Sequence, residues 1–316
     1  MTVQSSIRLG LIGAGRRGRA IIKAIDRTTS AHLVRVGSHK METSALVSSS
    51  CQIFPDWHAI LDPVALDGLI IATPPATHFS IASHALAAKI PTLIEIPLST
   101  TLEHAIALKK LTSPPLAIVN HTLLTHPAYR FIKELVRGHT IGPIRAIRSY
   151  FGAYCPDSPV LWNWGAQELA LCVDLLNASE PEDISARYIR RHATLGGSGE
   201  TVELRLDFVQ DTDVEVRIRL SNILEQKTHY FAVYFDRLTL VYDGSDSGTL
   251  KLHPPIPDFS VPDDTGQPVV LPMEDSLFNT ISWFVVAVAN RVEDTESLDL
   301  GVDVVALLER CQSVLE

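Results

Sequence analysis

The clearest chemical signal in the sequence is the spacing of three glycines near the start of the chain, Gly13, Gly15 and Gly18. Their pattern, G-x-G-x-x-G, is typical of the turn that carries the phosphates of a dinucleotide. Gly13 permits a tight turn, Gly15 lets the backbone approach a pyrophosphate, and Gly18 lets the next helix pack closely. The free N–H groups and partial positive charge of that helix end then face the phosphates. The triplet therefore predicts a dinucleotide-binding site.

The elements around the triplet favour this interpretation over an ordinary glycine turn. An apolar β-type run at 9–12 precedes it, and Ile21, Ile22 and Ile25 fall on one face of the helix predicted after it. A second strand at 33–36 follows where a βαβ unit places it. A lone triplet also fits a simple turn, so the strand–turn–helix–strand order carries the prediction.

The segment after the second strand normally contacts the ribose of the cofactor. NAD-specific sites usually have an acid there, whereas residues 37–40 of this chain read G-S-H-K. Ser38 and Lys40 suit a 2′-phosphate better, so the sequence favours NADP over NAD. Arg16 and Arg17 are candidate helpers in binding that phosphate. The alternative is that Lys40 is only a solvated surface charge.

Length and composition limit the classes of protein that the chain can form. Its 316 residues are enough for two domains, and 46% apolar and 20% charged residues are ordinary for a soluble globular protein. A formal charge of −9 argues against nonspecific nucleic-acid binding, which needs a basic surface.

The cysteines and the apolar runs indicate where the protein works. The four cysteines lack C-x-x-C spacing, so they predict neither a metal site nor a disulfide framework; they are Cys51, Cys155, Cys172 and Cys311. Residues 1–6 lack the pattern of a signal peptide, and the longest apolar run, 283–289, is too short to span a bilayer. We therefore expect a cytoplasmic protein with no membrane partner.

The first part of the chain alternates short apolar runs with amphipathic ones. Further strands are predicted at 69–72, 92–95 and 116–119, with a helix through 81–87 and another over 102–111. Thr100 or Thr101 is the expected N-cap of the second helix. This alternation predicts an α/β Rossmann domain over residues 1–120, whose parallel sheet binds ligands at the carboxyl ends of its strands.

The pattern changes after residue 120. A helix is predicted at 127–137 and a strand at 143–151, and apolar residues then alternate with polar ones at 202–208 and 214–220. Such alternation indicates a mostly antiparallel open sheet with one polar face. Helices follow at 275–290 and 301–315. We expect an α+β domain for substrate binding and dimerisation over residues 121–300.

The chain resembles the Gfo/Idh/MocA family of NAD(P)-dependent sugar and cyclitol oxidoreductases along its whole length. The resemblance rests on the glycine triplet and on four further motifs: A-T-P-P-A-T-H at 72–78, E-I-P at 95–97, G-H-T-I-G-P-I at 138–144 and L-W-N-W-G-A-Q-E-L at 161–169. It implies a Rossmann domain, a second domain whose open sheet often forms a homodimer interface, and a final helix at about 301–316 that packs back on the first domain.

The motifs at 72–78 and 95–97 also imply further residues on the cofactor side. Both lie at the carboxyl ends of predicted strands of the dinucleotide domain. The implied cofactor-binding residues are Thr73, Pro74, His78 and Glu95.

Two of the family's usual catalytic groups are replaced in this chain. Where the family has E-K-P, whose lysine contacts the nicotinamide ribose and the reacting hydroxyl, this chain has Ile96. Where it has W-D-x-G-x-H-D, Asn163, Gln167 and Glu168 replace the first Asp, the His and the last Asp. Asn163 and Gln167 cannot titrate but can hydrogen-bond a sugar. Trp164 can stack on its ring, although packing is the commoner use of a tryptophan.

If the site turns over, another group must serve as acid or base, because a positioned base contributes about a hundredfold to ten-thousandfold. We single out His121, Glu168 and Tyr154 for this role, with His126 and Tyr150 as further candidates. Each has a structural alternative: a hydrogen-bonded histidine, a glutamate that caps or pairs, and tyrosines that belong to a core or an interface.

Two functions from different classes remain open at this stage. One is an NAD(P)-dependent oxidoreductase that acts on a sugar, cyclitol or related polyol. The other is a catalytically silent pseudoenzyme that binds a dinucleotide and a small ligand as a sensor or regulator, as the family's galactose-regulon repressor does. The resemblance favours the first, and the joint loss of lysine and histidine favours the second, because a fold does not fix an activity.

Overall fold

The computed structural model describes residues 6–111, 116–139, 141–156, 158–194, 197–209, 213–245, 248–262, 265–292 and 295–315. Residues 1–5, on which the argument about a signal peptide rests, lie outside these ranges, as do Thr140 and Glu316. The chain forms two compact units. The first comprises Met1–Thr125 and Asp275–Val305, and the second His126–Glu274 and Ala306–Glu316.

The first unit is built on a six-stranded sheet in which every pair of neighbouring strands is parallel, as the sequence predicts. The strand order is β3-β2-β1-β4-β5-β6, so the order reverses between β1 and β4. Ligands of such sheets bind at this reversal, at the carboxyl ends of the strands. The strands are β1 (Ile7–Ile12), β2 (Ala31–Gly37), β3 (Gln52–Phe54), β4 (Gly68–Ile71), β5 (Thr92–Glu95) and β6 (Ala117–Asn120).

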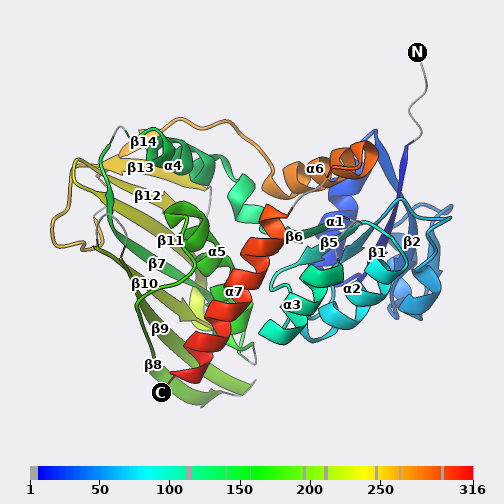
Figure 1. Cartoon of the computed structure of the whole chain (residues 1–316), viewed down its shortest axis with the longest axis horizontal. Coiled ribbons are helices and arrows are strands. Elements are labelled where there is room, and N and C mark those ends of the chain that lie inside the picture. The colour runs from blue at the N-terminus through cyan, green and yellow to red at the C-terminus, as the bar shows by residue number, and fades with distance from the viewer. Residues whose placement is uncertain are drawn as a thin grey trace. The chain divides into compact units, whose positions relative to one another are not determined.

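Helices cover both faces of this sheet, and β4, β5 and β6 consist entirely of buried residues. One apolar cluster joins the sheet to α1 (Arg16–Asp26) and α6 (Ser276–Asn290), and another joins it to α2 (His78–Ala87) and α3 (Leu102–Leu111) (Figure 1). Short 3₁₀ turns complete the unit: Met41–Ala45, Trp57–Ile60, Pro75–Thr77 and Thr122–Thr125.

Several local predictions are confirmed in this unit. Ile21, Ile22 and Ile25 are all buried on α1, and Thr101 Oγ1 accepts the N–H of His104, as expected of an N-cap. Ala87, the last residue of α2, is exposed.

The final helix, α7 (Glu296–Ser313), begins five residues before the predicted start at residue 301. Gly301 lies inside this helix, and a Cβ there would lie 2.8 Å from Val119 Cγ2. The glycine therefore serves close packing of the helix against β6 and does not end it. Leu298 and Val305 of α7 belong to the apolar cluster of α2 and α3.

The second unit contains an eight-stranded sheet of order β14-β13-β12-β11-β7-β10-β9-β8. It is mostly antiparallel, as predicted, with one parallel pair between β7 and β10. Its strands are β7 (Ile144–Tyr154), β8 (Asp183–Thr194), β9 (Gly197–Val209), β10 (Asp213–Ser221), β11 (Ile223–Phe235), β12 (Thr239–Asp243), β13 (Thr249–His253) and β14 (Gln267–Val269).

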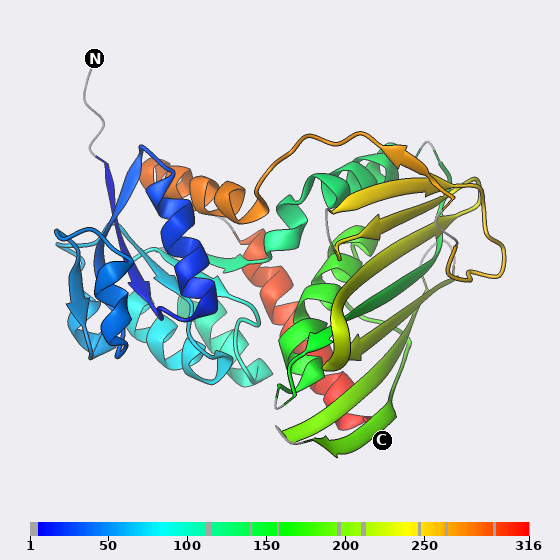
Figure 2. The ribbon, with the colours of Figure 1, turned by 180° about the vertical axis from the view of Figure 1, so that it is seen from behind.

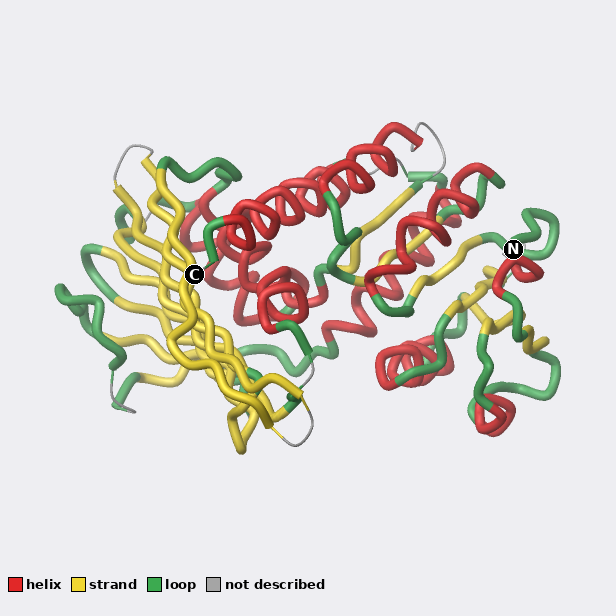
Figure 3. The backbone as a smooth tube through the Cα atoms, turned by 90° about the horizontal axis from the view of Figure 1, so that it is seen from below, coloured by secondary structure: helices red, strands yellow, loops and turns green. Residues whose placement is uncertain are grey.

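One face of this sheet is covered by helices, which pack against it on one side only (Figures 2 and 3). They are α4 (Pro127–Arg137), α5 (Ala166–Leu176), which is preceded by a π turn at Leu161–Gly165, and the end of α7 that belongs to this unit. The alternating apolar residues of β9 and β10 are buried, which confirms that part of the sequence analysis. Helix α6, expected in the domain of residues 121–300, belongs instead to the first unit, where it packs on α1.

None of the helices in the described residues combines the length and the hydropathy that a membrane span requires.

Candidate functional site

The glycine turn lies between β1 and α1, next to the point where the strand order reverses. Gly13 has a φ of +101°, and a Cβ there would lie 2.3 Å from the carbonyl oxygen of Ala72. A Cβ on Gly18 would lie 1.9 Å from the carbonyl oxygen of Gly13. A Cβ on Gly15 would meet nothing within 4 Å. Two glycines are therefore required by the fold, and the third opens onto free space.

That space is suited to an anionic group. Gly15 is the N-cap of α1, and the helix has neither a side-chain cap nor an acidic residue in its first turn. Its first N–H groups and its dipole are thus left for a ligand. The local geometry fits the pyrophosphate of a dinucleotide.

The predicted ribose-binding segment lies beside the glycine turn. The N–H of Gly13 donates to the carbonyl oxygen of Gly37, the last residue of β2, at 3.0 Å. Ser38 follows, and its hydroxyl lies 2.7 Å from Thr43 Oγ1 and accepts the N–H of Lys40 at 3.1 Å. The side chains of Lys40 and Arg16 are exposed. The structure thus brings the turn and this segment together.

Four polar residues, which we call the Arg17 cluster, lie along the carboxyl edge of the same sheet. Arg17 Nε lies 2.8 Å from Glu95 Oε1, and its Nη2 donates to Thr122 Oγ1. The Asn120 amide donates to Glu95 Oε1 at 2.6 Å, and the hydroxyl of Thr122 donates to Asn120 Oδ1 at 3.0 Å. Glu95 and Asn120 are the paired last residues of β5 and β6.

Burial and charge oppose each other at Glu95. The residue is 8% exposed, and this burial raises the pKa of its carboxyl, while Arg17 and Asn120 act to lower that pKa. The Arg17 side chain is 38% exposed, so its cation reaches the surface of the edge. Sequence reasoning identified Arg17 and Glu95 separately but missed Asn120 and Thr122.

His78 joins the two motif loops of the cofactor side. It is fully buried, with Nδ1 2.8 Å from the carbonyl oxygen of Pro97 and Nε2 2.9 Å from that of Thr73. Burial lowers the pKa of His78, and the two carbonyl groups oppose this. Thr73 also accepts a hydrogen bond from Thr77 at 2.7 Å, whereas Pro74 is exposed. This geometry fits a positioning role for His78.

The other predicted residues of the first unit are His121 and Ile96. His121 directly follows β6 and is 7% exposed. Ile96 packs against the apolar cluster of α2 and α3 and brings no polar atom to the edge.

In the second unit, Glu168 is fully enclosed on α5. Ser149 Oγ donates to its Oε2 at 2.5 Å, and His229 Nε2 lies 3.0 Å from its Oε1. His229 in turn stacks on Phe151, with ring centroids 4.4 Å apart. This arrangement fits the structural alternative for Glu168, a carboxylate that pairs. No sequence motif predicts a role for His229, because its partner, Glu168, lies on α5, far away in the sequence.

The predicted substrate residues lie together on one short segment. Asn163 and Trp164 belong to the π turn before α5, and Gln167 is in the first turn of that helix. Asn163 is exposed and the other two are partly exposed.

The remaining acid–base candidates differ in exposure. Tyr154 is 63% exposed at the end of β7, while Tyr150 is partly buried, which raises the pKa of its phenol. His126 caps α4 by accepting the N–H of Ala128 at 3.2 Å, and burial lowers its pKa.

The described residues contain no group of three or more His, Cys, Asp or Glu that could hold a metal ion. The four cysteines are free thiols, and of these only Cys155 is exposed.

Comparisons with known proteins agree with this geometry. The model of an oxidoreductase family with an NAD-binding Rossmann fold, Gfo/Idh/MocA, matches residues 7–114. A crystal structure from Magnetospirillum magnetotacticum MS-1, of a protein classed as an oxidoreductase, is 36% identical with a TM-score of 0.89. That likeness covers 97% of this chain and 100% of the other.

Two curated relatives carry named activities. UDP-N-acetylglucosamine 3-dehydrogenase of Acidithiobacillus ferrooxidans is 29% identical over 187 residues, which is 57% of each chain. Inositol 2-dehydrogenase of Acidothermus cellulolyticus is 25% identical over 237 residues, which is 69% of each chain. With the glycine turn, the parallel sheet and the full-length structural likeness, these matches show that the chain belongs to the Gfo/Idh/MocA family of oxidoreductases with an NAD-binding Rossmann fold.

Proposed function

We propose that the chain is an NAD(P)-dependent oxidoreductase that interconverts a secondary alcohol and a ketone on a sugar, cyclitol or related polyol. One observation carries the proposal: Gly15 opens onto free space at the uncapped end of α1, and the Arg17 cluster extends along the same sheet edge. The named activities of the two curated relatives, on a nucleotide sugar and on inositol, support this class of substrate.

In this proposal the two halves of the cofactor lie on opposite sides of Gly15. A pyrophosphate at Gly15 places the adenosine half toward Ser38 after β2. The nicotinamide half then extends over the ends of β4, β5 and β6, where the Arg17 cluster lies. We propose that Arg17 contacts the nicotinamide half, because its guanidinium is held at this edge by Glu95 and Thr122.

NADP is the proposed cofactor. Ser38, Lys40 and Arg16 remain as the residues for a 2′-phosphate, and both cationic side chains are exposed. The segment after β2 has no carboxylate at 37–40 to bind a free ribose hydroxyl, which supports this preference.

The chemistry divides between the cofactor and the chain. A nicotinamide held at this edge would supply the hydride acceptor for the carbinol carbon, and a base of the chain would take the hydroxyl proton. In our proposal Asn163 and Gln167 hydrogen-bond hydroxyls of the substrate, with Trp164 against the ring. His121 and Tyr154 are the preferred acid–base candidates, because Glu168 is enclosed by Ser149 and His229.

The organisation of the whole protein is also a proposal. We propose that the second unit holds the substrate and that the open face of its sheet forms a homodimer interface in a cytoplasmic protein. The polar face is internally paired: Glu203 binds Arg187 and Arg219, and Glu215 binds Arg205 and Arg217.

The alternative, a catalytically silent dinucleotide sensor, rests on the apolar packing of Ile96 and the enclosure of Glu168. Fluorescence titration of the purified protein with NADPH and NADH tests the binding that both functions need. A screen of polyols with NADP⁺, followed by nicotinamide absorbance, then separates them. Turnover supports the enzyme, and tight cofactor binding without turnover supports the sensor. If neither nucleotide binds at millimolar concentration, both functions fail.

A further inference from the structure

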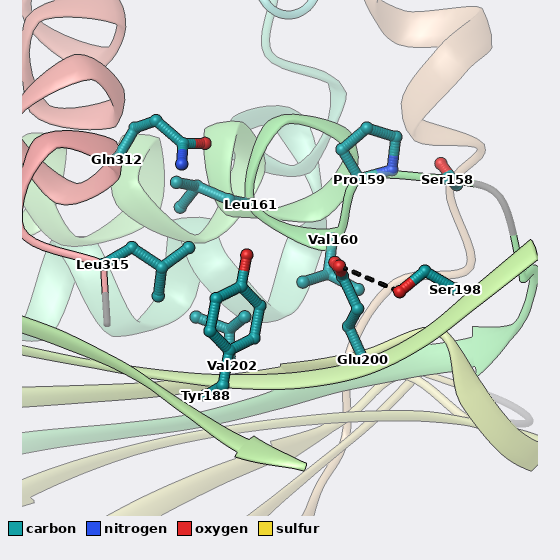
Figure 4. Close-up of a pocket in the computed structure, with 10 residues that line it drawn as sticks. All are labelled: Ser158, Pro159, Val160, Leu161, Tyr188, Ser198, Glu200, Val202, Gln312 and Leu315. Atoms are coloured by element: carbon teal, nitrogen blue, oxygen red, sulfur yellow. Dashed lines mark hydrogen bonds between the residues drawn. The ribbon is translucent and has the colours of Figure 1, made fainter. Parts of the chain in front are cut away.

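The second unit contains a pocket of about 300 Å³ that none of the candidate catalytic, cofactor-binding or substrate residues lines (Figure 4). Its walls come from the last turn of α7, the loop before α5 and strands β8 and β9. A volume near this value lies at the lower end of the range for small-molecule sites.

Polar groups from separate elements converge on this pocket. In Figure 4 the hydroxyl of Tyr188 and the amide of Gln312 point into the same space, with the carboxylate of Glu200 on the side of β9. Tyr188 is partly exposed and Gln312 is exposed, so the hydroxyl and the amide can reach a ligand that enters the pocket.

A single buried amide holds the walls in place. Asn222 is 1% exposed, and its Nδ2 donates to the carbonyl oxygens of Ser158 at 3.2 Å and Ser198 at 2.9 Å. Its Oδ1 accepts the N–H of Glu200 at 2.6 Å. The pocket is thus preformed, which lowers the entropic cost of binding.

The charge balance of the pocket selects the class of ligand. Glu200 is 13% exposed, accepts a hydrogen bond from Ser198 at 3.2 Å and pairs with Arg191 at 3.4 Å. No lysine or arginine is among the described residues that line the pocket, so a phosphate or carboxylate would face the Glu200 carboxylate; Arg191, which pairs with Glu200, is not a lining residue. Leu161 from the π turn and Val202, two residues after Glu200 on β9, add apolar side chains to the lining.

We propose that this pocket is a second ligand site, which binds a small neutral polyol such as a cyclitol or a monosaccharide. Glu200 accepts hydroxyl protons, Tyr188 and Gln312 complete the polar rim, and the apolar side chains contact the carbon skeleton. Binding at this site needs no dinucleotide, so it can be tested independently of the proposed oxidoreductase activity.

Methyl NMR of the full chain, labelled at leucine and valine and free of cofactor, tests the proposal because Val202 and Leu315 line the pocket. The probes are myo-inositol and D-glucose, with glucose 6-phosphate for comparison. We expect both neutral probes to shift the Val202 and Leu315 signals and the phosphate ester to bind more weakly.

The variants Gln312→Ala and Tyr188→Phe should each weaken binding about tenfold, the effect of one lost hydrogen bond. Gln226→Ala, an exposed glutamine on β11 outside the pocket, is the matched control and should bind as the parent does. Tyr188→Phe removes one oxygen atom, so the test remains valid if the Gln312 variant misfolds. Unmoved pocket signals, tighter binding of the phosphate ester, or unchanged affinity in both variants would overturn the proposal.

Discussion

Arg17 in the first turn of α1 and Glu95 at the end of β5 form an ion pair, with 2.8 Å between Nε and Oε1. The pair spans the point where the strand order of the sheet reverses, since α1 follows β1 and β5 lies beyond β4. One partner is nearly buried and the other is partly exposed, so the pair fixes a cation at the edge of the predicted cofactor site.

Arg17→Met should weaken NADPH binding about tenfold, because one charge-assisted contact to the cofactor is lost. Fluorescence titration measures this change. Arg19→Met is the matched control, since Arg19 lies on the same helix and pairs with the exposed Glu42. Equal losses in the two variants would contradict a specific role for Arg17.

Glu95 should make stability depend on pH. Burial raises its folded-state pKa above the ordinary value of 4.5, so the folded protein holds this proton more tightly than the unfolded chain. The contribution to stability is therefore present below about pH 4.5 and is lost as the pH rises through the raised pKa. Urea unfolding across this pH range should show a fall in the free energy of unfolding of the parent protein, and a smaller fall in Glu95→Gln. A parallel pH profile in the variant would refute this assignment, and Glu42→Gln serves as an exposed control.

The three glycines should separate folding from binding. Gly13→Ala and Gly18→Ala place a Cβ against backbone atoms and should each lower the free energy of unfolding by about 2–3 kcal/mol. Gly15→Ala meets open space, so its stability should change by less than about 1 kcal/mol while NADPH binding weakens at least about tenfold. Thermal unfolding and fluorescence titration distinguish the cases. Normal NADPH binding by Gly15→Ala would place the pyrophosphate elsewhere.

The sequence predicts those parts of the structure that depend on local pattern. The glycine triplet, the buried strands β4 to β6 and the alternation in β9 and β10 each need only neighbouring residues, and all are confirmed. The predicted start of α7 was five residues too late, and the close packing of Gly301 on Val119 joins segments far apart in the chain, which no local pattern specifies.

The contacts that define the candidate site are long-range and could not be predicted in this way. The role of Arg17 as a helper for a 2′-phosphate stays a prediction, whereas its contacts with Glu95 and Thr122, the latter 105 residues away, have no signal in the local pattern. The pairing of Glu168 with His229 likewise depends on α5 packing on β11, which no local pattern specifies.

Cofactor preference should depend on Lys40. Lys40→Ala removes the exposed cation proposed for the 2′-phosphate and should weaken NADPH binding about tenfold while leaving NADH binding unchanged. Parallel titrations with the two nucleotides measure the ratio. Lys23→Ala, an exposed lysine near the end of α1, controls for net charge. A ratio that stays constant would show that Lys40 is a solvated charge only.

Glu168→Gln distinguishes a catalytic carboxylate from a structural one. The substitution leaves His229 and Ser149 facing a neutral amide in a fully buried position, so we expect the free energy of unfolding to fall by about 3 kcal/mol. Chemical denaturation measures this loss, and His229→Gln should produce a similar one because it breaks the same pair. The double variant should then cost less than the sum of the two single variants. If Glu168→Gln instead keeps full stability and cofactor binding but abolishes turnover on an identified polyol, the carboxylate is catalytic and its pairing with His229 serves to orient it.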